Sequence, residues 1–219
     1  MSIATSKTAD LSLTKVLLAG GLIVSLAIGI RHGFGLFNLP ITQANGWGRE
    51  IFALAIALQN LVWGMSQPVF GGLADRFGGY KVMILGGVLF TLGLVGSGLS
   101  TSSFGFVMST GVVIGLALAC TTYSVVYGVI GRNCSPEKRV WAMGMAAAMG
   151  SFGQFFMIPV EQELLTHFGI QNALFILAII TSFMVPLSLI LREKNYQPAQ
   201  TSSDQTIIHA IKEAFGQRS

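Results

Sequence analysis

Long apolar runs alternate with short polar segments along most of the chain. A helix needs about 20 consecutive, mainly apolar residues to cross the hydrocarbon core of a bilayer. Six runs reach that length, and they cover residues 15–39, 51–72, 82–100, 104–130, 139–161 and 171–191. The pattern therefore predicts an all-α membrane protein in which six transmembrane helices form one bundle over 15–191.

Polar sequence flanks this bundle on both sides. Residues 1–14 are predicted to form a cytoplasmic N-terminal segment, and the apolar run that follows is too long for the core of a cleavable signal peptide. Residues 192–219 are predicted to be a cytoplasmic linker, with a candidate amphipathic helix over 205–215. The apolar face of that helix would consist of Ile207, Ile208, Ile211 and Phe215.

Lysine and arginine gather on one side of the predicted membrane topology. With six crossings, eleven bases share the side of both termini, whereas the opposite loops hold Arg49. The eleven are Lys7, Lys15, Arg76, Lys81, Arg132, Lys138, Arg139, Arg192, Lys194, Lys212 and Arg218. Because positive residues mark the cytoplasmic face, we expect a multi-pass protein of the cell inner membrane with both termini in the cytoplasm.

Composition excludes several function classes. The chain is 52% hydrophobic and 10% charged, where a soluble domain carries about 25% charged residues. Its bases are not interleaved with stacking aromatics, so nucleic acid is not an expected partner. Cys120 and Cys134 suggest neither a disulfide nor a metal site. The sequence has no metalloprotease, serine hydrolase or Walker motif, so we expect no enzyme, no metal and no cofactor.

Small residues recur at helical spacing within the apolar runs. Gly29 and Gly33 form a G-x-x-x-G pair, as do Gly111 and Gly115. In the fifth run, small residues stand at Gly144, Ala148 and Gly150. Such residues let helix backbones approach closely in lipid, so we expect helix packing at these positions rather than a phosphate-binding loop.

The stretch GLADRFGGYK, residues 72–81, places an acid and two bases between two apolar runs. From the residues alone it is a tight cytoplasmic turn in which Arg76 and Lys81 could pair with Asp75 or with helix C-terminal carbonyls. With Gly71, its residue order resembles the loop 2–3 signature of the major facilitator superfamily. That resemblance implies a gating latch that includes Asp75, Arg76, Lys81 and the motif glycines Gly71 and Gly78.

Other segments extend the resemblance to residues 10–192. Arg31-His32-Gly33-Phe34-Gly35, Trp63-Gly64 and Pro136-Glu137-Lys138-Arg139 are similar to a bacterial branch near monocarboxylate and oxalate/formate carriers. The arginine that many proton-coupled antiporters carry early in span four is absent, which disfavours a drug antiporter. The resemblance implies one half, a 3+3 repeat, of a two-half fold. We therefore expect the missing C-terminal half, or a partner chain, to supply the second six helices.

Polar side chains inside the predicted spans are the candidate substrate-binding residues. Arg31 would anchor an anion, although a structural ion pair or a base reaching the interface is an equally good interpretation. Asn38 is seven residues on, so it shares the helical face of Arg31. Gln59 and Trp63 belong to one stripe of span two, which either lines a pathway or bonds between helices. Three more candidates are Tyr123 and Tyr127 in span four and Gln154 in span five.

Two functions from different classes fit these residues. The first is secondary active transport of a small organic anion, monocarboxylate-like, by alternating access across the bilayer. The alternative is a truncated, non-transporting membrane fragment or interaction subunit, because six helices alone do not enclose a substrate. The sequence leaves proton symport and anion exchange both open.

Overall fold

The computed structural model describes residues 11–193, and regular structure in that part of the chain is helical. The predictions for residues 1–10 and 194–219, including the amphipathic helix over 205–215, lie outside the described residues. The elements are α1 (Leu13–Gly33), η1 (Phe34–Phe37), α2 (Asn38–Asn45), α3 (Arg49–Phe77), α4 (Gly79–Leu99), α5 (Ser103–Val107), η2 (Met108–Val113), α6 (Ile114–Thr121), α7 (Tyr123–Asn133), α8 (Pro136–Ser182) and α9 (Met184–Ile190). All six predicted ranges are largely helical, and the helices extend past most of their predicted ends.

Four helical segments in the described part are long and apolar enough to cross a membrane. They are Leu13–Asn45, Gly79–Leu99, Ser103–Asn133 and Pro136–Ile190. The last has 55 residues, more than twice what one crossing needs. The helix α3 is not one of these four segments, because Gln59, Asn60 and Gln67 interrupt its apolar sequence and lower its mean hydropathy. The all-helical membrane fold is therefore confirmed, while the number of six crossings and the 3+3 repeat stay predictions.

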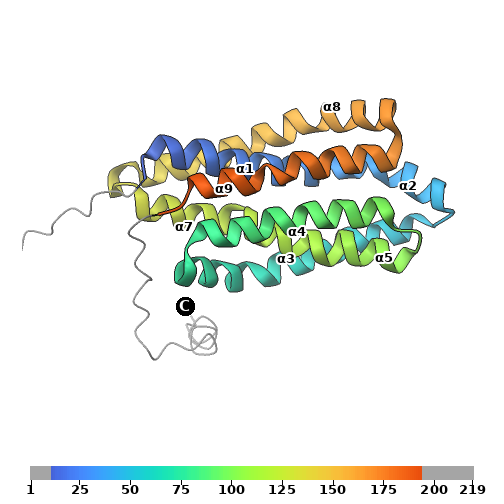
Figure 1. Cartoon of the computed structure of the whole chain (residues 1–219), viewed down its shortest axis with the longest axis horizontal. Helices are drawn as coiled ribbons and strands as arrows, with labels where there is room; N and C mark the ends of the chain where they lie inside the picture. Colours follow the sequence, from blue (N-terminus) through green and yellow to red (C-terminus); the bar gives the residue numbers. More distant parts are fainter. Residues whose placement is uncertain (1–10, 194–219) are drawn as a thin grey trace, which may run out of the picture.

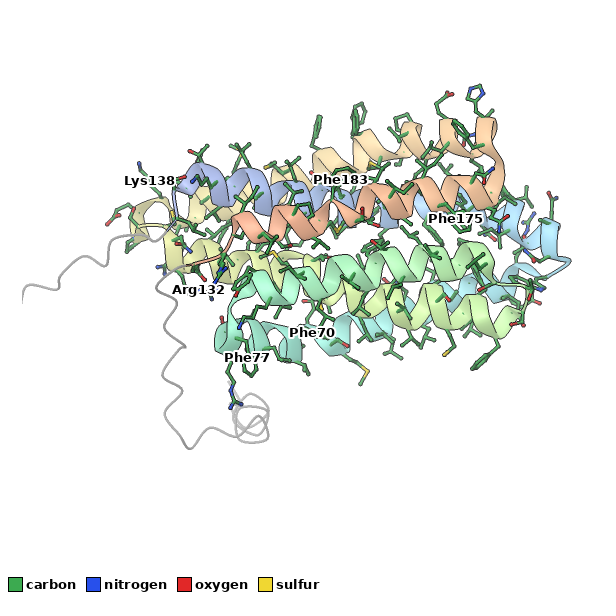
Figure 2. The ribbon with its side chains drawn as sticks, in the orientation of Figure 1. Phe70, Phe77, Arg132, Lys138, Phe175 and Phe183 are labelled. Atoms are coloured by element: carbon green, nitrogen blue, oxygen red, sulfur yellow. The ribbon has the colours of Figure 1, made fainter. Side chains whose placement is uncertain are left out.

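The long helices run along a common direction and form an elongated bundle (Figure 1). Gly169 has φ 71° and ψ 177°, a left-handed conformation that interrupts α8 and suits glycine. The chain reverses there, so the two parts of α8 lie antiparallel (Figure 1). Phe77, Arg132 and Lys138 lie toward the same end of the bundle (Figure 2), which agrees with the predicted clustering of bases on one side.

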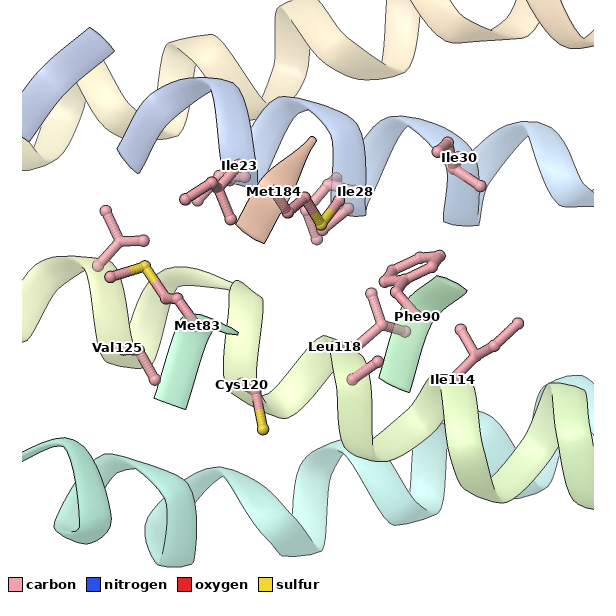
Figure 3. Packing of buried hydrophobic residues seen from close by; sticks show 14 of the residues in the cluster. Ile23, Ile28, Ile30, Met83, Phe90, Ile114, Leu118, Cys120, Val125 and Met184 are labelled. Atoms are coloured by element: carbon pink, nitrogen blue, oxygen red, sulfur yellow. The ribbon is translucent and has the colours of Figure 1, made fainter. Parts of the chain in front are cut away.

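Apolar side chains fill the space between the helices and also cover the outer surface. Ile23 of α1, Phe90 of α4 and Leu118 of α6 are fully buried in the cluster that Figure 3 shows. On the outside, Phe155 of α8 is 78% exposed and Phe104 is 73% exposed. In water such side chains would form a large apolar patch, whereas lipid tails are an equally apolar solvent. The surface therefore fits a bilayer.

The small-residue positions pack as expected, with one exception. A Cβ on Gly29 would lie 2.6 Å from the Gly153 carbonyl oxygen on α8. A Cβ on Gly115 would lie 3.0 Å from the Gln59 carbonyl oxygen on α3. These close approaches confirm helix packing at both G-x-x-x-G pairs. Gly144 differs, because a Cβ there meets no atom of the structure within 4 Å.

Candidate functional site

Arg31 lies near the end of α1 and turns toward α3. Its Nη2 donates a hydrogen bond to Asn60 Oδ1, and its Cζ lies 5.0 Å from the centroid of the Trp63 ring. The side chain is half-buried, and Nε is buried with no hydrogen-bond partner in the described structure. Within that same part, no carboxylate lies at ion-pair distance from Arg31. The alternative of a structural ion pair is therefore not observed.

Trp63 connects Arg31 to the fourth apolar segment. Its indole Nε1 donates to Thr122 Oγ1 at 3.1 Å. Thr122 has φ −103° and ψ −164°, which separates α6 from α7. Directly after this break, the rings of Tyr123 and Tyr127 lie 5.5 Å apart on one face of α7.

The fifth apolar segment approaches the same tyrosine pair. The hydroxyl of Tyr123 comes close to Gly150 of α8, where any Cβ would collide with it. Gln154 is one turn further along α8 and is half-buried. The structure therefore links Arg31 of α1 to Asn60 and Trp63 of α3 and, through Thr122, to the start of α7. We call five of them the Arg31 cluster: Arg31, Asn60, Trp63, Thr122 and Tyr123.

Two predicted binding residues lie apart from this cluster. Gln59 is only 2% exposed, and its Nε2 donates to the Thr110 carbonyl oxygen at 2.9 Å. Gln59 therefore bonds between helices, which is one of the two interpretations of the polar stripe in span two. Asn38 is half-buried at the start of α2, and its Oδ1 has no partner among the described residues.

The predicted gating stretch forms the turn between α3 and α4. Gly78 has φ 96°, which a residue with a side chain rarely adopts, while Gly71 lies within α3 with no atom near its Cβ position. The Arg76 guanidinium lies 5.3 Å from the centroid of the Phe77 ring. The Lys81 ammonium lies 5.9 Å from the Tyr80 ring centroid.

Asp75 pairs with Arg132, a residue outside the predicted gating stretch. Arg132 Nη1, at the end of α7, lies 2.9 Å from Asp75 Oδ1. The same guanidinium contacts the buried Glu193 through Nε at 3.4 Å, and Asn133 Nδ2 donates to that carboxylate at 2.5 Å. The ends of α3, α7 and α9 are thus joined by one charged network. No sequence pattern indicated this network, because Arg132 was recognisable only as one of the bases on the predicted cytoplasmic side.

The structure corrects the prediction for Glu161. Glu161 is the last residue of the fifth predicted run, 139–161, so it was expected at a membrane edge, but it is fully buried on α8, at 0% exposure. The helix continues through the expected loop as far as Gly169, so Glu161 remains inside the bundle rather than at its edge. Hydrophobic periodicity alone does not reveal which face of a long helix is covered.

The groups that these residues offer are those that could recognise an ion. Among residues 11–193, no group of three His, Cys, Asp or Glu side chains is placed to hold a metal ion. Cys120 and Cys134 are free, buried thiols. The Arg31 cluster instead offers a cation, amide and hydroxyl groups and aromatic rings on helices that approach one another. Such a set suits a small anion with an organic body.

Comparison with known proteins places the chain among membrane carriers. A model described as Major Facilitator Superfamily matches residues 17–218. Monocarboxylate transporter 11 of Mus musculus is 32% identical over 150 residues, which are 68% of this chain and 32% of that relative. The MFS-type transporter pynF of Aspergillus niger is 22% identical over 90% of this chain and 46% of its own length. Methyl viologen resistance protein SmvA of Salmonella typhimurium is 30% identical over 56% of this chain and 23% of its own length.

Proposed function

Because the chain belongs to the Major Facilitator Superfamily, we propose that it carries a small organic anion across the membrane as the N-terminal half of a secondary transporter. The superfamily consists of transporters rather than enzymes, and the chain is a multi-pass membrane protein. The matched region spans about a third of monocarboxylate transporter 11. A second six-helix half, in the same or another chain, would complete the binding site opposite the Arg31 cluster.

The Arg31 guanidinium is the observation that supports an anionic substrate. A lone arginine within a membrane helix is costly, at about 2.5–3.5 kcal/mol on insertion scales, and such residues are usually paired. Arg31 has amide and aromatic neighbours but no carboxylate within the described residues. A substrate carboxylate would supply the missing charge. A cation of the methyl viologen kind would instead be repelled.

Alternating access would open and close the end of the bundle that carries Asp75. The Asp75–Arg132 ion pair joins α3 to α7, so it is suited to latch that end while the substrate site faces the other way. We place this end, with both termini, on the cytoplasmic side of the cell inner membrane. The placement within a bacterial branch of monocarboxylate-like carriers stays a prediction.

Uptake by the complete two-half protein in proteoliposomes tests this function. We expect saturable uptake of labelled small monocarboxylates and no uptake of a bipyridinium dication. Uptake of the dication with none of any carboxylate would contradict the proposal. A correctly folded complete protein that moves neither solute would favour the alternative of a non-transporting membrane protein.

A further inference from the structure

Glu161 is a buried acid without a visible partner. Its side chain is 0% exposed, and neither Oε1 nor Oε2 has a hydrogen-bond partner in the part of the chain that the structure describes. No lysine, arginine or histidine nitrogen of that part lies within ion-pair distance of it. A carboxylate held this way would have lost its hydration without compensation, which costs several kcal/mol or more.

The carboxyl group lies where α1 and α8 pack closely against each other. Along α8, Gly153 meets Ser25, and Met157 packs at Gly29, each step advancing one helical turn on both helices. Glu161 takes the next place in this row and meets Gly33. A Cβ built on Gly33 would lie 2.5 Å from the Glu161 Cδ and Oε2 atoms. The acid therefore occupies an interface position that packing alone would give to an apolar side chain.

Charged groups on the adjoining elements are engaged elsewhere. On α1, the Arg31 guanidinium bonds Asn60 of α3, and the exposed His32 ring bonds the Ile28 carbonyl oxygen of its own helix. On α8 itself, exposed Glu163 and His167 pair with each other at 3.0 Å. The short η1 carries no titratable residue.

The remaining neighbours of α8 bring their titratable groups to other levels of the bundle. The helix α7 meets α8 at Gly150 through Tyr123, about three turns before Glu161, and its other titratable groups lie still further along. The helix α4 packs on the returning part of α8 near Leu174 and Thr181. Its titratable residues, Tyr80 and Lys81, lie at its opposite end.

We propose that Glu161 is a proton-binding site that is closed between α1 and α8. In the described conformation a proton on the carboxyl group removes the cost of an unpaired buried charge. Separation of Gly33 from Glu161 would admit water and release the proton, leaving a hydrated carboxylate. The proposal deepens the proposed function by naming a proton as the coupling ion, and it rests on that function only for the transport consequence.

Infrared spectroscopy of the purified protein tests the proton site without any transport. At neutral pH we expect the carbonyl-stretch band of a protonated carboxylic acid, lost in Glu161→Gln and retained in the matched control Glu163→Gln. The glutamine is neutral and similar in shape, so the variant should keep its melting temperature. If Glu161→Gln does not fold, the wild-type protein decides the question: the acid band should persist at neutral pH and disappear in strongly alkaline solution. A wild-type spectrum without the band at neutral pH, or an unchanged spectrum in Glu161→Gln, overturns the proposal.

A second pair of variants tests the role of the contact itself. Gly33→Ala should force the carboxyl group out of its place and shift or remove the acid band, whereas Gly35→Ala, with no atom within 4 Å of its Cβ position, should leave the band unchanged. Equal spectra for the two variants would count against a site closed by Gly33.

The coupling itself is tested in proteoliposomes. Glu161→Gln should lose the stimulation of uptake by an imposed proton gradient while keeping exchange of labelled for unlabelled substrate. Retained stimulation would overturn the coupling. If the wild-type protein moves no carboxylate at all, the proposed function fails, and the infrared result still decides the proton site.

Discussion

Replacing Arg31 by alanine should lower carboxylate uptake by the complete transporter about 100-fold. The guanidinium is the one cation of the Arg31 cluster, and a hydrogen bond between charged groups contributes about 1.5–3 kcal/mol. Arg31→Lys should retain part of the activity, because lysine keeps the charge but loses the planar donor fork and the stack on Trp63. Initial rates of labelled-substrate uptake give both values.

A loss of folding would not explain this result. Arg31 has no carboxylate partner among the described residues, so its removal takes away a costly membrane charge and breaks no ion pair. The amount of purified Arg31→Ala protein and its melting temperature should match those of the wild type. Arg49→Ala is the matched control, since Arg49 is exposed at the start of α3. Unchanged substrate affinity in Arg31→Ala would remove the anchor role.

Adding a single methyl group at Gly153 should destabilise the bundle strongly. A Cβ there would collide with the backbone of Ser25 on α1, and a helix backbone cannot yield as a flexible side chain can. Overpacking of this kind costs about 1–3 kcal/mol or more. Thermal unfolding of Gly153→Ala in detergent can be monitored by the loss of the monodisperse peak. We expect its melting temperature to be clearly lower than that of the wild type.

Gly144→Ala provides a control with the opposite expected sign. Gly144 is on the same helix, but a Cβ there meets nothing within 4 Å. At an exposed position inside a helix, alanine stabilises the helix by up to about 1 kcal/mol relative to glycine. This variant should therefore be as stable as the wild type or slightly more stable. Equal destabilisation by both substitutions would show that close α1–α8 packing is not what holds the bundle.

The sequence predicted the helices and their close contacts well, for a physical reason. Apolar runs of the length needed to cross a bilayer are a one-dimensional signal, and small residues spaced four apart mark where backbones can touch. The α1–α8 contact at Gly29 and the α3–α6 contact at Gly115 are both of this kind. Arg31 was also recognisable, because any charge inside such a run requires an explanation.

Pairing across helices was not predictable from periodicity. Nothing in the apolar run around Thr122 signals a helix break, since it contains no proline or glycine beside that residue. Arg132 resembles any other base near a membrane edge until the structure brings Asp75 and Glu193 to it. Glu161 lies near the predicted end of a run, where acids are common, and only the long α8 shows it to be enclosed.

Equilibrium binding of a matched pair of ligands shows whether Arg31 recognises the charge of a carboxylate. A small monocarboxylate and its uncharged amide differ mainly in the charge that Arg31 would recognise, so their affinities for the complete transporter isolate that interaction. We expect the carboxylate to bind about 10- to 100-fold more tightly than the amide, and Arg31→Ala to remove the difference. Equal affinities for the two ligands in the wild-type protein would contradict this expectation.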